Sequence, residues 1–161
     1  MSKSAPWFAG AAAIVLADQL TKWLVLARFA PGERVELTSF FNLVLVFNKG
    51  AAFSFLAAEA GWQTPVLAVF ALGAALVVSV LLVRSPERRM LCAGLALILG
   101  GALGNLVDRL RFGQVVDFLD FHAAGWHWPA FNVADSAISI GAVILILEGF
   151  IRREKQPGAA S

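Results

Sequence analysis

Four long apolar stretches alternate with polar segments along the chain. Each is close to the ~20 residues that an α-helix needs to cross about 30 Å of hydrocarbon. The stretches cover residues 7–27, 65–83, 90–107 and 133–151. The pattern predicts a single membrane domain over residues 1–161, with the fold class of a membrane all-α protein built as a bundle of four transmembrane helices.

Composition agrees with a membrane protein. Hydrophobic residues make up 59% of the chain and charged residues 15%, and the mean hydropathy is +0.75. Soluble domains have roughly 45–50% apolar and about 25% charged residues. The single cysteine, Cys92, lies in the third apolar stretch, which excludes an internal disulfide and a cysteine-based metal cluster. The net charge of +2 requires no nucleic-acid partner, and we expect none.

Basic residues indicate how the bundle is oriented. Lys3, the turn at 84–89 and the tail at 152–155 hold seven of the 13 lysines and arginines. Short basic segments stay in the cytoplasm, so we predict that both termini are cytoplasmic and that residues 28–64 and 108–132 form outward loops. Apolar character continues for longer than in a signal peptide, so we expect the first helix to remain uncleaved.

The first outward loop has the pattern of β-structure. Residues 36–47 are rich in aromatic and β-branched types, and the turn signal Asn-Lys-Gly follows at 48–50. We predict a strand, a turn and a second short strand at 51–55, in a small extracytoplasmic β-sheet lying on the membrane surface. The apolar pattern fits equally well a sheet that only caps the bundle. Residues 55–63, with Trp62, are expected to form a short interfacial helix.

Three of the apolar stretches carry polar stripes toward their outer ends. Asp18, Thr21 and Lys22 have the i, i+3, i+4 spacing that places them on one helix face. The other two stripes consist of Gly101, Asn105, Asp108 and Arg109, and of Asn132, Asp135, Ser136 and Ser139. Polar groups cannot face lipid without cost, so we expect the three stripes to face one another inside the bundle.

Two aspartates, Asp117 and Asp135, lie at the edges of apolar stretches on the same predicted side of the membrane. Two carboxylates that converge in a poorly solvated place can share one proton, which is the arrangement of an aspartic protease. Asp135 also fits a helix cap, and Asp117 a surface-loop acid. We interpret Asp120, three residues after Asp117, as solvated.

The remaining charged residues are predicted to have structural roles. We interpret Asp18 with Lys22, and Asp108 with Arg109, as ion pairs that stabilise the bundle. The two histidines, His122 and His127, have a spacing that is poor for a shared metal site, and we predict that they are surface-loop residues. We expect no metal and no cofactor.

Five motifs in order along nearly the whole chain resemble a known family. They are Asp-Gln-Leu-Thr-Lys at 18–22, Asn-Lys-Gly-Ala-Ala-Phe at 48–53, Gly-Asn-Leu-Val-Asp-Arg at 104–109, Val-Val-Asp-Phe at 115–118 and Phe-Asn-Val-Ala-Asp at 131–135. The set closely resembles the lipoprotein signal peptidases (signal peptidase II) of bacteria. Each motif alone is weak, but five in order on a four-span topology are highly specific.

The resemblance implies an aspartic endopeptidase of the bacterial cytoplasmic (inner) membrane. Such enzymes remove the signal peptide from diacylglyceryl-modified prolipoproteins by cutting just before the lipidated cysteine, and they are blocked by globomycin-type inhibitors. Asp117 and Asp135 match the family's catalytic pair. By the same resemblance, the residues expected to line or support the site are Asn48, Gly50, Asn105, Arg109, Asn132, Asp18, Lys22 and Asp108. We expect a monomer in contact with membrane lipids.

Functions of other classes predict different patterns. A small proton-coupled transporter or channel would distribute acids across the depth of the bilayer, whereas here the polar groups gather at one end and Glu148 lies near the other. A lipid-modifying transferase would need a metal-chelating acidic motif or a phosphate-binding cluster. A non-catalytic assembly subunit would leave the pair of aspartates unexplained.

Overall fold

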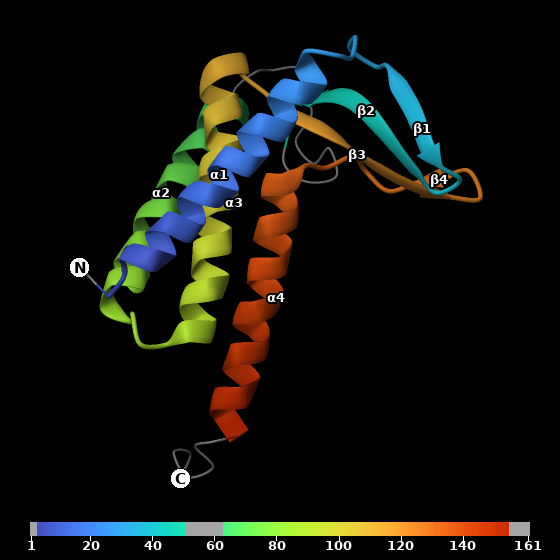
Figure 1. The fold of residues 1–161 in the computed structure, drawn as a ribbon. Helices are drawn as coiled ribbons and strands as arrows, with labels where there is room; N and C mark the ends of the chain where they lie inside the picture. Colours follow the sequence, from blue (N-terminus) through green and yellow to red (C-terminus); the bar gives the residue numbers. More distant parts are fainter. Residues whose placement is uncertain (1–2, 51–62, 155–161) are drawn as a thin grey trace.

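The computed structural model describes residues 3–50 and 63–154, which form four long helices and a small antiparallel sheet (Figure 1). The helices are α1 (Ala5–Leu26), α2 (Gln63–Arg84), α3 (Arg89–Phe112) and α4 (Val133–Glu154). All four are long and apolar enough to span a membrane. The prediction of a four-helix membrane bundle with a small sheet is therefore confirmed.

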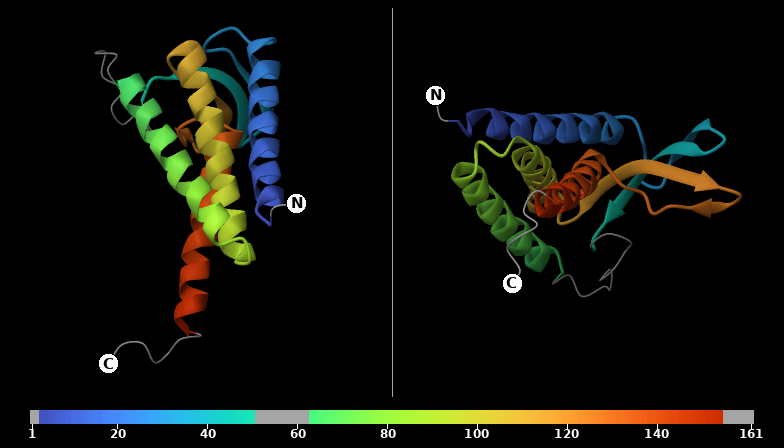
Figure 2. Two further views of the ribbon diagram at one scale, coloured as in Figure 1. Left: turned by 90° about the vertical axis from the view of Figure 1, so that its left-hand side faces the viewer. Right: turned by 90° about the horizontal axis from the view of Figure 1, so that it is seen from below.

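Helix α3 is the centre of the bundle and packs against each of the other three helices (Figure 2). Glycines allow this close approach. A Cβ atom at Gly101 would lie 2.4 Å from the carbonyl oxygen of Ala134 on α4, and one at Gly104 would lie 2.7 Å from Oδ2 of Asp18 on α1. Both distances are shorter than any real contact, so the helix spacing requires glycine at these positions.

The sheet lies at one end of the bundle, and the two termini and the α2–α3 turn lie toward the other end (Figure 1). Its strands are β1 (Arg34–Thr38), β2 (Phe41–Asn48), β3 (Val115–Ala123) and β4 (Trp126–His127), in the order β1-β2-β3-β4. In the register of β2 and β3, Asn42 is opposite Asp120 and Val46 is opposite Asp117.

The sequence predicted the sheet but placed its strands incorrectly. The segment at 36–47, expected to be one strand, is divided by a turn at residues 39–40, where the backbone N–H of Phe40 donates to Oγ1 of Thr38. Asp117 was expected in a loop, but it lies on β3, which pairs with β2. The predicted strand at 51–55 lies outside the described residues, as does nearly all of the predicted helix at 55–63, whose last residue, Gln63, begins α2.

A buried ion triad joins α1 and α3 at their ends nearest the sheet. Nζ of Lys22 lies 2.8 Å from Oδ2 of Asp18 and 2.7 Å from Oδ2 of Asp108, and all three side chains are at most 2% exposed. The expected pair of Asp108 with Arg109 is wrong, because α3 continues through Phe112 and turns Asp108 toward α1.

The two carboxylates of the triad also hold backbone groups. Oδ1 of Asp18 accepts a hydrogen bond from the backbone N–H of Ala134 at the start of α4, at 2.9 Å. Oδ2 of Asp108 accepts one from the backbone N–H of Val116 in β3, at 3.1 Å. One lysine and two aspartates thus connect α1, α3, α4 and β3.

We predict that Lys22→Met lowers the free energy of unfolding by about 3–5 kcal/mol, because it leaves two buried carboxylates without their cation. Denaturant or thermal unfolding in detergent micelles measures the change. Lys3→Met is the matched control, since the Lys3–Glu87 pair is exposed and contributes little. The triple variant Lys22→Met, Asp18→Asn, Asp108→Asn should regain part of the lost stability; a triple variant less stable than Lys22→Met would contradict this account.

Candidate active site

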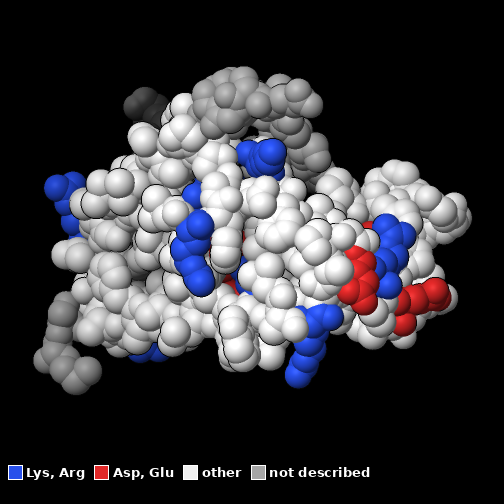
Figure 3. Space-filling model, turned by 90° about the horizontal axis from the view of Figure 1, so that it is seen from above, with Lys and Arg blue, Asp and Glu red and all other residues white. Residues whose placement is uncertain are grey.

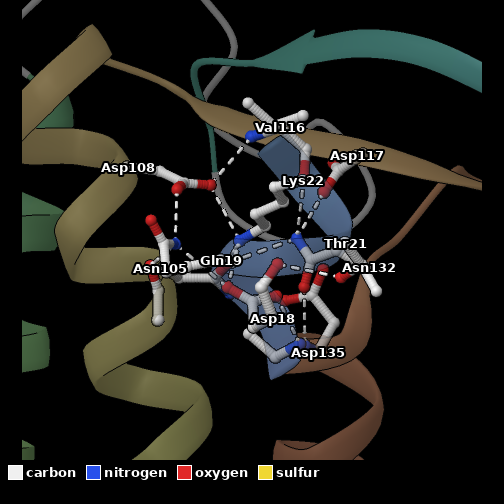
Figure 4. Close-up of polar contacts among 12 residues, drawn as sticks. Asp18, Gln19, Thr21, Lys22, Asn105, Asp108, Val116, Asp117, Asn132 and Asp135 are labelled. Atoms are coloured by element: carbon white, nitrogen blue, oxygen red, sulfur yellow. Dashed lines mark hydrogen bonds and ion pairs between the residues drawn. The ribbon is translucent and has the colours of Figure 1, made fainter. Parts of the chain in front are cut away.

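The ends of α1, α3 and α4 nearest the sheet meet β3 in a network of polar side chains (Figure 4). Asp117 projects from β3 into this network and is 2% exposed. Both of its carboxylate oxygens accept amide hydrogen bonds: Oδ1 from Nδ2 of Asn132 at 2.7 Å, and Oδ2 from Nδ2 of Asn48 at 3.1 Å. The β2–β3 pairing brings Asn48 to this carboxylate.

Asp135 lies in the first turn of α4, but Asn132 is the residue that caps the helix. Oδ1 of Asn132 accepts the backbone N–H of Asp135 at 2.9 Å, as an N-cap side chain does. The Asp135 carboxylate is therefore not used as a cap. Its Oδ1 instead accepts a hydrogen bond from Nδ2 of Asn105 on α3 at 2.7 Å.

Two asparagines link the aspartates. Nδ2 of Asn132 lies 2.7 Å from Asp117 and 3.2 Å from Oδ1 of Asn105, and Asn105 in turn holds Asp135. Nζ of Lys22 donates to the same Oδ1 of Asn105 at 3.0 Å. A lysine ammonium can only donate, so it turns the Asn105 oxygen toward itself and the NH₂ group toward Asp135.

The environment of Asp117 favours its protonated form. Burial and then the charge of Asp135 raise the pKa of Asp117 from 3.8 to about 7, although the hydrogen bonds from Asn48 and Asn132 act in the opposite direction. The charge of Asp135 therefore acts on Asp117, and near neutral pH Asp117 is poised between its charged and neutral forms.

A cavity of about 700 Å³ opens beside Asp135. Its polar lining includes Asn48, Gly50, Asn105, Arg109, Ser136 and Ser139. Much of the remaining lining is apolar, contributed by α2, α3, α4 and the segment that leads into α4. The Arg109 guanidinium contacts the carbonyl oxygens of Gly50, at 3.3 Å, and Asn105, at 3.4 Å. A polar end beside apolar walls can hold a peptide bond at the end of a hydrophobic segment.

The structure brings together all ten predicted site residues, in two layers. Five line the cavity: Asn48, Gly50, Asn105, Arg109 and Asp135. The other five, Asp18, Lys22, Asp108, Asp117 and Asn132, are buried and are connected to the first group through the ion triad and the asparagine amides. Of the predicted stripes, Thr21 does not join the network, because its hydroxyl donates to backbone carbonyl oxygens of its own helix.

Two predictions about nearby residues are wrong. Asp120, expected to be solvated, is 3% exposed and accepts hydrogen bonds from Asn42 and His127. The histidines are not on a plain surface loop: His122 lies on β3, and its ring stacks on that of His127 at 4.9 Å. Strand pairing buries Asp120, whereas His127 stays exposed on β4, and the local sequence gives no direct sign of this arrangement.

Gln19 belongs to the site but was not predicted from the sequence. Its Nε2 donates to Oδ1 of Asp108 at 2.9 Å and to the carbonyl oxygen of Gly104 at 3.1 Å, so it supports the ion triad from α1. Its position directly after Asp18 in the first motif was the available signal. Within residues 3–50 and 63–154, no group of three or more His, Cys, Asp or Glu side chains is arranged to hold a metal ion.

Comparison with known proteins agrees with this fold. The family model described as "Signal peptidase (SPase) II" matches residues 10–151. A lipoprotein signal peptidase of Janthinobacterium sp. (strain Marseille) is 55% identical over 91% of this chain and 89% of its own. One of Paraburkholderia phytofirmans is 58% identical over 89% of this chain and 84% of its own.

Two solved structures share this fold. A bacterial membrane enzyme determined at 2.3 Å resolution superposes with a TM-score of 0.83 at 25% identity, covering 97% of this chain and 93% of that one. A second, at 1.9 Å, has a TM-score of 0.77 at 27% identity, with 88% and 90% covered. The fold and its relatives define a multi-pass inner-membrane aspartic peptidase. The chain belongs to the signal peptidase II family.

We predict that Asn48→Ala raises the pKa of Asp117 above 7, because it removes a hydrogen bond that favours the charged carboxylate. A pH titration of the aspartate carboxyl signals, by ¹³C NMR or infrared spectroscopy, measures the shift without reference to activity. Asn42→Ala is the matched control, since Asn42 donates to Asp120 instead. An unchanged or lower pKa in Asn48→Ala would contradict the assigned role of this amide.

Proposed function

We propose that this protein removes the signal peptide from diacylglyceryl-modified prolipoproteins, cutting just before the lipidated cysteine, with Asp117 and Asp135 as the catalytic pair. The names of its relatives, lipoprotein signal peptidases, support the substrate class. The observation that carries the proposal is the approach of two aspartates, buried Asp117 from β3 and half-buried Asp135 from α4, beside a cavity with polar and apolar ends.

The pair supplies what amide hydrolysis requires. One carboxylate is ionised and takes a proton from a water molecule, whose oxygen then attacks the scissile carbonyl carbon. The other carboxyl is protonated and donates a hydrogen bond to the carbonyl oxygen, which becomes negative in the tetrahedral intermediate. When the C–N bond breaks, the proton taken from water passes to the leaving amine. The raised pKa of Asp117, about 7, supports one shared proton at neutral pH.

The amides keep the pair aligned. Asp117 accepts an N–H from Asn132, whose side chain is fixed because its oxygen caps α4. Asp135 accepts an N–H from Asn105, whose oxygen is held by Lys22. Arg109 and Gly50 lie on the cavity wall, where a guanidinium and a backbone group suit the substrate's peptide carbonyl and N–H groups. Catalytic groups held in this way need little reorganisation during the reaction.

The cavity also suits a substrate that arrives within the membrane. Its apolar lining includes Phe70 on α2, Ala102 on α3, and Ile138 and Ile140 on α4. A signal helix and acyl chains can contact these walls while the scissile bond reaches the polar end. The lipid on the cysteine then fixes the depth of the bond in the bilayer, which adds specificity without a deep side-chain pocket. Globomycin-type inhibitors should occupy the same cavity.

A proton-coupled transporter or channel is the alternative, and the remaining acid argues against it. Glu148, at the far end of α4, is bound by Arg88 next to the α2–α3 turn. Among the described residues, the other acid away from the sheet that forms an ion pair is Glu87, which pairs with Lys3, so no series of acids crosses the bundle.

We predict that Asp117→Asn and Asp135→Asn each abolish cleavage of a diacylated prolipoprotein while the protein stays folded and inserted. Asparagine has nearly the same shape but cannot take a proton from water. The double variant should be hardly slower than either single variant, because the two groups act as a unit. Gel separation of precursor and mature lipoprotein measures cleavage, and Glu36→Gln on the exposed strand β1 controls for loss of one carboxylate.

The same assay tests the lipid requirement. Wild-type protein should cleave the diacylated precursor and leave the same precursor without lipid intact. Normal cleavage by Asp117→Asn would refute the catalytic pair, and equal cleavage of both precursors would refute the substrate class.

We also propose that both termini face the cytoplasm and that the sheet and cavity lie at the outer face. The basic segments at 84–89 and 152–155 support this orientation. Reporter proteins fused after Gln63 and after Arg84 should report opposite compartments, outside and inside respectively. A report of the same compartment from both fusions would contradict the proposed topology.

A further inference from the structure

One buried carboxylate outside the catalytic pair contacts a side chain from every other strand of the sheet. Oδ2 of Asp120, on β3, accepts a hydrogen bond from Nδ2 of Asn42 on β2 at 2.8 Å. Nδ1 of His127 on β4 lies 2.8 Å from Oδ1 and 3.0 Å from Oδ2, and Nε of Arg34 on β1 lies 3.6 Å from Oδ2. Asp120 is only 3% exposed and Asn42 is also buried, whereas the Arg34 and His127 side chains that reach Asp120 are 52% and 36% exposed.

The row is built around a charged aspartate. Burial alone would raise the pKa of Asp120, but hydrogen bonds from Asn42 and His127 and the positive charges nearby outweigh it and lower that pKa. An ionised carboxylate can only accept, so both Asn42 and Nδ1 of His127 are donors here. The His122 ring stacks on that of His127. On the face shown in Figure 3, the acidic side chains appear chiefly over the sheet, beside basic ones.

His127 begins the segment that leads to the catalytic pair. The backbone N–H of Trp128 donates to the carbonyl oxygen of Phe121, and Phe131 pairs with Leu119 of β3. The next residue is Asn132, which holds Asp117 and caps α4. Residues 128–131 also line the cavity beside Asp135. The segment is therefore fixed at both ends, by the His127–Asp120 contact and by Asn132.

We propose that Asp120 and His127 are positioning residues: their contact holds residues 128–131 as a wall of the cavity and thereby aligns Asn132 with Asp117. The proposal rests on the proposed function, because it assigns to this wall an effect on peptide-bond cleavage. Neither residue touches the substrate. Backbone hydrogen bonds join the wall to β3 at Trp128 and at Phe131. The His127–Asp120 contact adds a side-chain anchor at the start of the wall.

Substitution of His127 tests the contact directly. His127→Ala should lower kcat/KM for the diacylated prolipoprotein on the order of ten- to hundredfold, since small displacements of positioned groups have effects of this size. His127→Asn should restore most of the activity, because an asparagine NH₂ can take the place of Nδ1–H and donate to Asp120. Glu36→Gln is the matched control: it faces Asn42 from β1 but is exposed, and it should keep wild-type activity.

Asp120→Ala removes the other half of the contact, and its kcat/KM should fall by a similar factor. In the double variant His127→Ala, Asp120→Ala, the loss should be hardly larger than in either single variant, because both substitutions break the same contact.

The outcomes separate this proposal from the proposed function. Undiminished kcat/KM in His127→Ala, or a double variant whose loss is the product of the two single losses, would overturn the positioning role. A lower melting temperature with unchanged kcat/KM per folded molecule would also overturn it, and would leave a purely structural contact. Asp117→Asn is assayed in parallel, and its cleavage of the substrate would refute the catalytic pair whatever the His127 variants do.

Discussion

The structure depends on a single buried cation. Lys22 lies between Asp18 and Asp108 where water is excluded, and each carboxylate also holds a backbone N–H of another element. Buried charges are tolerated only when their partners are complete, so this triad fixes how α1, α3, α4 and β3 meet. Gly104 has no side chain because Asp18 occupies that space. The helix contacts and the polar core therefore constrain each other.

The same cation determines the orientation of the amides around the proposed catalytic pair. Lys22 turns the oxygen of Asn105 toward itself, which leaves the NH₂ group for Asp135, and Asn132 divides its two ends between the cap of α4 and Asp117. The oxygen of each amide is thus held by a structural partner, and its NH₂ group faces a carboxylate. A site built in this way is aligned before substrate arrives.

The helix bundle and the sheet make different contributions to the site. The proposed peptide hydrolysis by two carboxylates needs a poorly solvated site. The packed ends of the helices provide this environment, and burial there raises the pKa of Asp117. One of these carboxylates comes from a strand, however, and its position depends on the β2–β3 register and on the segment after β4. The small sheet is therefore part of the site and not only a cap on the bundle. A row of contacts centred on Asp120 holds its four strands together.

The sequence by itself determined the four spans, because helix length and hydrophobicity are local properties that the bilayer makes decisive. The five motifs and their polar stripes also indicated the family and most of the residues that the site brings together. Only the tertiary structure decided which charges pair. Asp108 pairs with Lys22 and not with its neighbour Arg109, and Asp120 is buried by three other strands. These outcomes depend on register and on contacts between distant segments, which no local pattern of residues specifies.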